Sequence, residues 1–281
     1  MIKKIAVVGC GWFGLPLARA LQNEGYQVIG SKRHADEAQK LTREGIDCVA
    51  LDLSESEVVG TAKETLTPLL DADAMVINIP PALRSGKTDY LERLKRLKQM
   101  MLPRRLQRLI FISSTGVYPP GSDCLETEVL PQQTSESLLL QAEYLLAKDP
   151  LLLAPEGGAV ILRFAGLIGP GRHPGRFLAG RTNLTGARHH VNLVHLNDCI
   201  GATVTVLKVP QPSAIYNLCA PEHATKQAFY TQAAQSLQLP APEFQIDNSV
   251  IGDKRVSGDR ICHELGYVYR VPTLAQMLAQ C

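Results

Sequence analysis

The feature that most constrains this chain is the glycine-rich turn Gly9-Cys10-Gly11-Trp12-Phe13-Gly14, which follows the apolar run at residues 5–8. Its glycines have the spacing G-x-G-x-x-G, in which the first permits a tight turn, the second admits a closely approaching ligand, and the third lets strand and helix pack. Phe13, Leu17 and Leu21 then recur every four residues, which is typical of one helix face. A strand, turn and helix in this order direct backbone N–H groups at the pyrophosphate of a dinucleotide.

The rest of the chain repeats the alternation of apolar runs and helical stretches. Further apolar runs lie at residues 28–29, 49–51, 75–79, 109–112 and 160–162. This order predicts an α/β fold of the Rossmann type, with a doubly wound parallel sheet. A chain of 281 residues that is 45% hydrophobic can also bury a second, smaller lobe. We expect a dinucleotide-binding Rossmann domain over 1–165. A mainly substrate-binding, interleaved lobe is expected over 166–281, with part of it returning to the Rossmann core.

Composition argues against several other classes of protein. The 29 basic and 27 acidic residues are interspersed and give a net charge of +2, so nucleic acid is not an expected partner. No apolar run approaches ~20 residues and no leader pattern is present, which predicts a cytoplasmic protein that does not span a membrane. The seven cysteines lack Cys-x-x-Cys spacing and are expected to be reduced. His189 and His190 are adjacent and should point to opposite faces of a strand, so no metal is expected.

The end of the second expected strand bears on the choice of dinucleotide. Sites for NAD usually carry an acidic residue about 20 positions after the glycine turn, but this chain has Ser31-Lys32-Arg33 there. A hydroxyl and two cations suit a 2′-phosphate, which predicts NADP in preference to NAD. The alternative is that Lys32 and Arg33 are solvated loop charges. Asp52, at the end of the third strand, is expected either to touch the adenine or to cap a turn.

Later motifs carry a family resemblance. Ser113-Ser114-Thr115-Gly116-Val117-Tyr118 is similar to a Ser-Ser-x-x-Val-Tyr strand end. Residues 162–172 are similar to a Leu-Arg…Tyr-Gly-Pro-Gly segment, and residues 191–198 to an Ile-His-Val-x-Asp signature. In these motifs the chain resembles an extended short-chain dehydrogenase/reductase of the NAD-dependent epimerase/dehydratase type, and most closely its atypical branch. The resemblance implies that Ser114 is the catalytic serine. It also implies cofactor contacts near the nicotinamide, from Asn78, Ile79, Pro80, Ser113 and Leu139.

The chain departs from the family at the Tyr-x-x-x-Lys motif. When Glu143 is matched to the glutamate that follows this motif, the tyrosine place holds Ser135 and the lysine place holds Leu139. Tyr144 and Lys148 match the motif literally, but nine residues further along a helix correspond to about half a revolution. We interpret them as a chance match on the outer face; the alternative is a shifted register in which Tyr144 is the acid.

An incomplete catalytic tetrad implies weakened or altered catalysis, because a serine hydroxyl ionises too weakly to replace the tyrosine. Ser135 would then face the nicotinamide, and Tyr118 is the candidate for a stand-in acid beside Ser114. The nearby acids Asp123, Glu126 and Glu128 are alternative proton carriers, but we interpret them as solvated loop residues.

Two functions follow from these expectations. The first is an NADP-dependent, epimerase/dehydratase-like oxidoreductase acting on a small carbonyl or sugar-type substrate. The second is a catalytically silent NADP-binding protein that reports cofactor redox state. The expected partner is a small molecule, with a homodimer as a further option.

Overall fold

The structure is a computed structural model that describes residues 1–54, 63–81, 89–102, 104–121, 123–127, 137–147, 149–245 and 249–281. The chain divides into two compact units. The first consists of Met1–Ser113, Pro131–Leu162 and Leu207–Ile215, and the second of Ser114–Leu130, Arg163–Val206 and Tyr216–Cys281.

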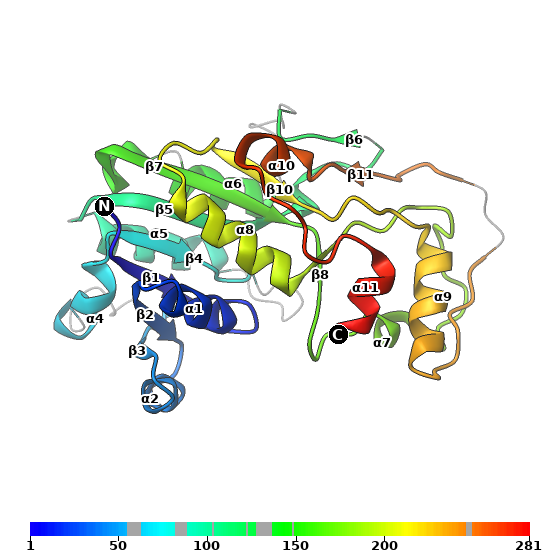
Figure 1. Cartoon of the computed structure of the whole chain (residues 1–281), viewed down its shortest axis with the longest axis horizontal. Helices are drawn as coiled ribbons and strands as arrows, with labels where there is room; N and C mark the ends of the chain where they lie inside the picture. The colour runs from blue at the N-terminus through cyan, green and yellow to red at the C-terminus, as the bar shows by residue number, and fades with distance from the viewer. Residues whose placement is uncertain are drawn as a thin grey trace. The chain divides into compact units, whose positions relative to one another are not determined.

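The principal sheet has seven strands in the order β10-β7-β5-β4-β1-β2-β3 (Figure 1). In chain order these strands are β1 (Lys4–Val8), β2 (Gln27–Lys32), β3 (Asp47–Ala50), β4 (Ala74–Ile77), β5 (Leu106–Ser114), β7 (Leu153–Phe164) and β10 (Ile215–Leu218). β1 pairs in parallel with β2 and β4, β2 pairs in parallel with β3, and β4 with β5. The predicted α/β Rossmann fold class is therefore confirmed.

Helices of the first unit cover both faces of this sheet. They are α1 (Gly14–Asn23), α2 (Ala35–Arg43), α4 (Lys63–Leu70), α5 (Tyr90–Met101) and α6 (Leu138–Ala147), with the short η3 (Pro150–Leu152). Ala6 and Val8 share a core with Leu94 and Leu97 of α5. Val7 alternates to the other face, where its Cγ1 lies 3.4 Å from the position that a Cβ on Gly14 of α1 would take.

The second unit is built from shorter elements. They are η2 (Thr115–Val117), β6 (Asp123–Cys124), β8 (Gly166–Ile168), α7 (Gly175–Leu178), β9 (Leu193–His195), α8 (Leu196–Lys208), α9 (Lys226–Ser236), β11 (Arg255–Val256), α10 (Asp259–Leu265) and α11 (Leu274–Ala279). β6 pairs with β11, and β8 with β9, both in parallel. Phe229 of α9 and Met277 of α11 meet in a buried core with Ile168 and Leu193.

One buried carboxylate organises the C-terminal segment of this unit. Asp198, in the first turn of α8, is completely buried. It accepts hydrogen bonds from the Tyr267 hydroxyl at 2.8 Å and from the backbone N–H groups of Arg270 at 2.7 Å and Val271 at 3.1 Å. Since a buried carboxylate is costly without donors, these bonds tie the segment after α10 to α8.

No helix among the described residues combines the length and apolar character needed to cross a membrane.

Candidate functional site: a glycine turn and an adjoining cavity

The glycine turn leaves open space at one of its three glycines. Gly9 has φ +101°, and a Cβ atom there would lie 2.4 Å from the Asn78 carbonyl oxygen. A Cβ atom on Gly14 would lie 2.1 Å from the Gly9 carbonyl oxygen, whereas one on Gly11 would meet no described residue within 4 Å. Gly9 and Gly14 are therefore required by the packing of the chain itself. The space beside Gly11 is the space that a closely approaching pyrophosphate needs.

Two side chains fix the position of this turn. The Gly9 N–H donates to Ser31 Oγ at 3.1 Å, and Asn78 Nδ2 donates to the Gly9 carbonyl oxygen at 3.3 Å. Ser31 is only 3% exposed. The hydroxyl that we expected at a 2′-phosphate is thus engaged in holding the glycine turn.

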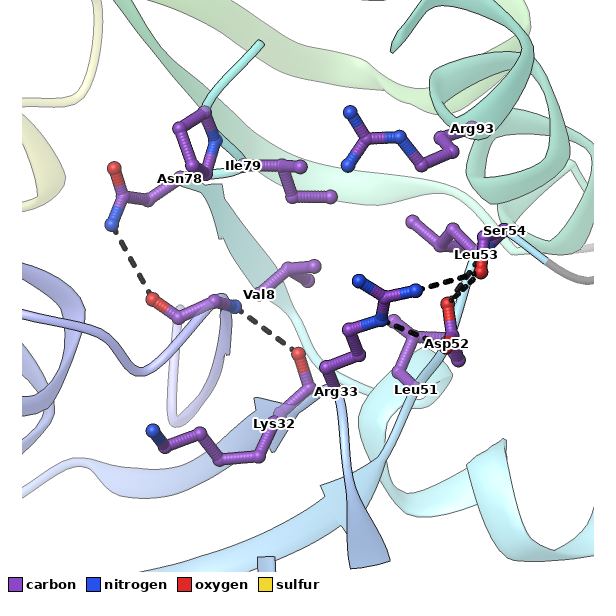
Figure 2. A pocket seen from close by; sticks show the side chains of 13 residues that line it. Val8, Lys32, Arg33, Leu51, Asp52, Leu53, Ser54, Asn78, Ile79 and Arg93 are labelled. Atoms are coloured by element: carbon purple, nitrogen blue, oxygen red, sulfur yellow. Dashed lines mark hydrogen bonds and ion pairs between the residues drawn. The ribbon is translucent and has the colours of Figure 1, made fainter. Parts of the chain in front are cut away.

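A cavity of about 320 Å³ adjoins the turn (Figure 2). It is lined by Val8, Gly9, Ser31, Lys32, Arg33, Leu51, Asp52, Leu53, Ser54, Asn78, Ile79, Pro80 and Arg93. The structure brings together eight of the residues predicted for cofactor binding, namely Gly9, Ser31, Lys32, Arg33, Asp52, Asn78, Ile79 and Pro80. Sequence reasoning missed Val8, Leu51, Leu53, Ser54 and Arg93. Val8, Leu51 and Leu53 form apolar walls that suit a flat ring. Leu51 and Leu53 could have been predicted, because they flank Asp52 at the end of a strand.

Arg33 is held at the cavity by Asp52 and Ser54 (Figure 2). Its Nε donates to Asp52 Oδ2 at 2.8 Å and its Nη2 to Ser54 Oγ at 3.0 Å. Asp52 also accepts from the Ser54 N–H at 2.9 Å, so it caps a turn, one of its two expected roles. Burial alone would raise the pKa of Asp52, but the hydrogen bonds from Ser54 and Arg33 outweigh it and lower the pKa to about 2.

Lys32 has a carboxylate partner of its own. Its Nζ lies 3.4 Å from Glu37 Oε1, and Figure 2 shows the Lys32 side chain directed away from Arg33. Both cations are therefore paired, which is a more ordered arrangement than the solvated loop charges of the alternative interpretation.

Arg93 of α5 is the cation that the sequence analysis overlooked. Its Nε lies 3.2 Å from Asp89 Oδ1, yet Nε and Nη2 are buried and make no hydrogen bond with any described residue. A buried donor without an acceptor is unfavourable by ~1–3 kcal/mol, so the Nη2 group, which has no partner among the described residues, favours a ligand that brings an acceptor. The signal was present in the sequence, because Arg93 lies three residues after Tyr90 and beside Leu94 on the buried face of the helix.

The remaining cofactor candidates lie outside the cavity lining. Phe13 is 3% exposed and packs in the core, while Trp12 is partly exposed. The Ser113 hydroxyl is buried and donates to Glu143 Oε1 at 2.6 Å. Leu139 of α6 packs against the first unit's core.

On the outer side of α6, Tyr144 is 39% exposed, as expected for a residue on that face. Ser135, Lys148 and Glu128 lie outside the described residues.

Two catalytic candidates belong to the second unit. Ser114 Oγ accepts from the Gly116 N–H at 3.1 Å and so caps η2, and it donates to no acceptor among the described residues. Tyr118 is 2% exposed; its hydroxyl donates to Asn217 Oδ1 at 2.8 Å and accepts from Arg163 Nη1 at 2.9 Å. Burial raises the pKa of Tyr118, while Arg163 opposes that rise. The hydrogen bond to Asn217 would have to break before Tyr118 could donate its proton to a substrate, whereas the bond from Arg163 could remain.

Glu126 corrects one expectation. Although a solvated loop carboxylate was expected, Glu126 is 8% exposed and its Oε1 accepts from the Asn217 N–H at 2.8 Å. Burial raises the pKa of Glu126, against the effect of that hydrogen bond. Asp123 is exposed, as expected.

Among the described residues, no group of His, Cys, Asp and Glu side chains is arranged to bind a metal ion. Both ring nitrogens of His190 have protein partners. Nδ1 lies 2.6 Å from Asp253 Oδ2, and Arg255 Nη2 donates to Nε2 at 2.7 Å.

Comparisons with known proteins agree with this geometry. Residues 4–85 match the family model described as the NAD binding domain of 6-phosphogluconate dehydrogenase. The N-terminal part of the chain is therefore an NAD-binding Rossmann domain. The whole chain is 43% identical over 275 residues to the protein YeeZ of Escherichia coli K12, covering 96% of this chain and 97% of that protein. The chain belongs to the YeeZ family.

Solved structures resemble the fold over nearly the whole chain. UDP-glucuronic acid 4-epimerase of Bacillus cereus, in complex with UDP-glucuronic acid and NAD, has a TM-score of 0.74 and 21% identity, covering 99% of this chain and 97% of its own. A conserved protein of Silicibacter pomeroyi, described as functionally unknown, has a TM-score of 0.73 and 23% identity, with 99% and 97% covered. At these identities the likeness concerns the fold.

Proposed function

We propose that the chain is an NADP-binding oxidoreductase of the epimerase/dehydratase kind, acting on a small carbonyl or sugar-type substrate with altered catalysis. The observation that carries the cofactor part is the charge of the cavity beside the glycine turn. Among the described residues, its lining includes three cations, Lys32, Arg33 and Arg93, and one carboxylate, Asp52. Two adjacent cations at the end of β2 can exchange their carboxylate partners for a phosphate, which suits a nucleotide that carries one more phosphate than NAD.

Each part of the cavity would hold a different part of the cofactor. The backbone N–H groups around Gly11 would bind the pyrophosphate at the start of α1. Lys32 and Arg33 would exchange Glu37 and Asp52 for the 2′-phosphate, and Arg93 would donate to an acceptor of the adenosine part. When bound, the cofactor supplies a hydride donor or acceptor, and the chain supplies its position.

The substrate part of the proposal is supported by the motif around Ser114 and by likeness of fold. The family resemblance of the Ser114 strand end favours a substrate carbonyl or hydroxyl near that serine, which would polarise it through its remaining proton. The Bacillus cereus epimerase, whose complex contains UDP-glucuronic acid, supports a sugar-type substrate by likeness of fold alone.

The burial of Tyr118 favours a second candidate function. With its hydroxyl bonded to Asn217 and Arg163, no acid replacing the family tyrosine stands out among the described residues. General acid–base help is typically worth 10²–10⁴-fold in rate, so its loss would leave slow turnover. A catalytically silent NADP-binding sensor would have the same cavity and the same cofactor preference.

The experiment is a fluorescence titration of the chain with NADPH and NADH. We expect NADPH to bind at least ~10-fold more tightly, or about 1.4 kcal/mol. Lys32→Met should weaken NADPH selectively, whereas Arg93→Met should weaken both nucleotides by a similar factor, since both carry adenosine. Arg104→Met is the matched control, because Arg104 pairs with Asp71 at 2.7 Å away from the cavity. Equal affinities for the two nucleotides in the parent protein would overturn the NADP assignment.

Activity then separates the two candidate functions. NADPH oxidation should be followed across aldehydes, ketones and nucleotide sugars, with Ser114→Ala beside the parent. Slow turnover that Ser114→Ala abolishes supports the oxidoreductase, and tight NADPH binding without turnover on any substrate supports the sensor.

A further inference from the structure

Two cysteines of the first unit lie against the same glycine. Cys10, in the glycine turn, is 1% exposed, and Cys48 of β3 is partly exposed. Gly30 of β2 is the sheet partner of Cys48. A Cβ atom on Gly30 would lie 2.5 Å from Cys10 Sγ and 3.6 Å from Cys48 Sγ. Because Gly30 has no side chain, the two sulfur atoms share the space over β2.

The two thiols are neighbours that influence each other's ionisation. Both are reduced, and the Cys10 thiol donates to the Val7 carbonyl oxygen at 3.6 Å. The neighbouring Cys48, together with burial, raises the pKa of Cys10. The neighbouring Cys10, aided by the charge of Lys32, lowers the pKa of Cys48 although burial opposes the change. Since the thiolate is the nucleophile, Cys48 is the more reactive of the two.

Cys48 is also accessible to a reagent of moderate size. It lines a hollow of about 410 Å³, whose lining also includes Gln39, Thr42 and Arg43 of α2 and Thr65 of α4. The guanidinium of Arg43 and the amide of Gln39 suit a reagent that carries carboxylates and peptide bonds.

We propose that Cys10 and Cys48 form a redox modification site, which closes to a disulfide when the protein meets a low-molecular-weight disulfide such as oxidised glutathione. The Cys48 thiolate attacks the reagent, forms a mixed disulfide and releases one glutathione thiolate. The Cys10 thiol then attacks the Cys48 sulfur, and its proton leaves with the second glutathione. The protein loses two electrons and two protons, and one oxidised glutathione becomes two reduced molecules.

Closure of this bond alters the glycine turn. In the reduced protein the Cys10 N–H donates to the Ser31 carbonyl oxygen at 2.9 Å, beside the bond from Gly9 to Ser31 Oγ. Bonded sulfur atoms lie ~2.05 Å apart, much closer than two separate thiols can approach, so Cys10 is drawn toward β3. The turn then leaves the arrangement that receives a pyrophosphate. This consequence rests on the proposed function, whereas formation of the bond does not.

The test compares the full chain before and after incubation with oxidised glutathione. Peptide mapping should recover a Cys10–Cys48 crosslink, and NADPH affinity should fall at least ~10-fold and return on treatment with dithiothreitol. Affinity of Cys48→Ser and Cys10→Ala should not respond to the oxidant, whereas the control Cys262→Ser, which alters a half-buried cysteine of the second unit, should respond like the parent. By reciprocity, saturating NADPH should slow the crosslink without changing modification of Cys262.

Two results would overturn the proposal: a map in which Cys48 stays a mixed disulfide with glutathione, or a crosslinked protein with undiminished affinity. If the reduced protein binds no NADPH, the proposed function fails, and the crosslink is still decided by the peptide map alone.

Discussion

At the scale of single residues, the glycines of the turn have two different roles: some are required by the packing of the chain, and one leaves space for a ligand. The sequence motif names three equivalent glycines, but the structure distinguishes them. Gly14 is closed in by the Gly9 carbonyl oxygen, while the position beside Gly11 is open. The spacing alone could not make this distinction, because it depends on how α1 packs on β1.

We predict that alanine has opposite effects at these two positions. Gly14→Ala should lower the free energy of unfolding by ~1–3 kcal/mol, since its Cβ would lie 2.1 Å from a backbone oxygen. Gly11→Ala should keep the stability of the parent but lose most of its NADPH affinity, because its methyl group enters the space of the pyrophosphate. Urea unfolding and nucleotide titration of both variants check this. Unchanged NADPH binding in Gly11→Ala would contradict the placement of the pyrophosphate.

At the scale of elements, sequence reasoning succeeded where a pattern is local. The strand–turn–helix unit of β1 and α1 and the alternation of later strands follow from short-range periodicity. The partners of side chains do not. Arg33 meets Asp52 because β3 lies beside β2, with Lys32 opposite Ala50. Tyr118 meets Asn217 across 99 residues of chain. Such pairs depend on the tertiary arrangement, so the burial of Tyr118 and Glu126 could not be read from the sequence.

Asp198 gives a prediction at this scale. Asp198→Asn should lower the free energy of unfolding by ~1–3 kcal/mol, since the amide presents N–H groups to donors that need an acceptor. Asp259→Asn, which changes an exposed acid in the first turn of α10, is the control and should cost little. Urea unfolding of the two variants compares them. Equal stabilities would mean that Asp198 does not tie the C-terminal segment to α8.

At the scale of the whole molecule, cofactor binding should raise the free energy of unfolding of the first unit. NADPH at 100 times its dissociation constant adds ~2.7 kcal/mol to the stability of the state that binds it. We expect hydrogen exchange to slow across β1, β2 and β4, which carry the glycine turn and the cavity, and Gly11→Ala to remove the effect. Exchange that slows only in α9 and α11 would place the nucleotide in the second unit instead.

The course of the chain between its two units has a consequence for how such a protein can change over evolutionary time. The backbone passes from one unit to the other after residues 113, 130, 162, 206 and 215. Each unit is therefore encoded by three separate segments of the gene, and neither unit can be transferred to another protein as one contiguous segment. A new specificity in the second unit must arise by substitutions and loop insertions within an intact gene, while the nucleotide site is inherited with it.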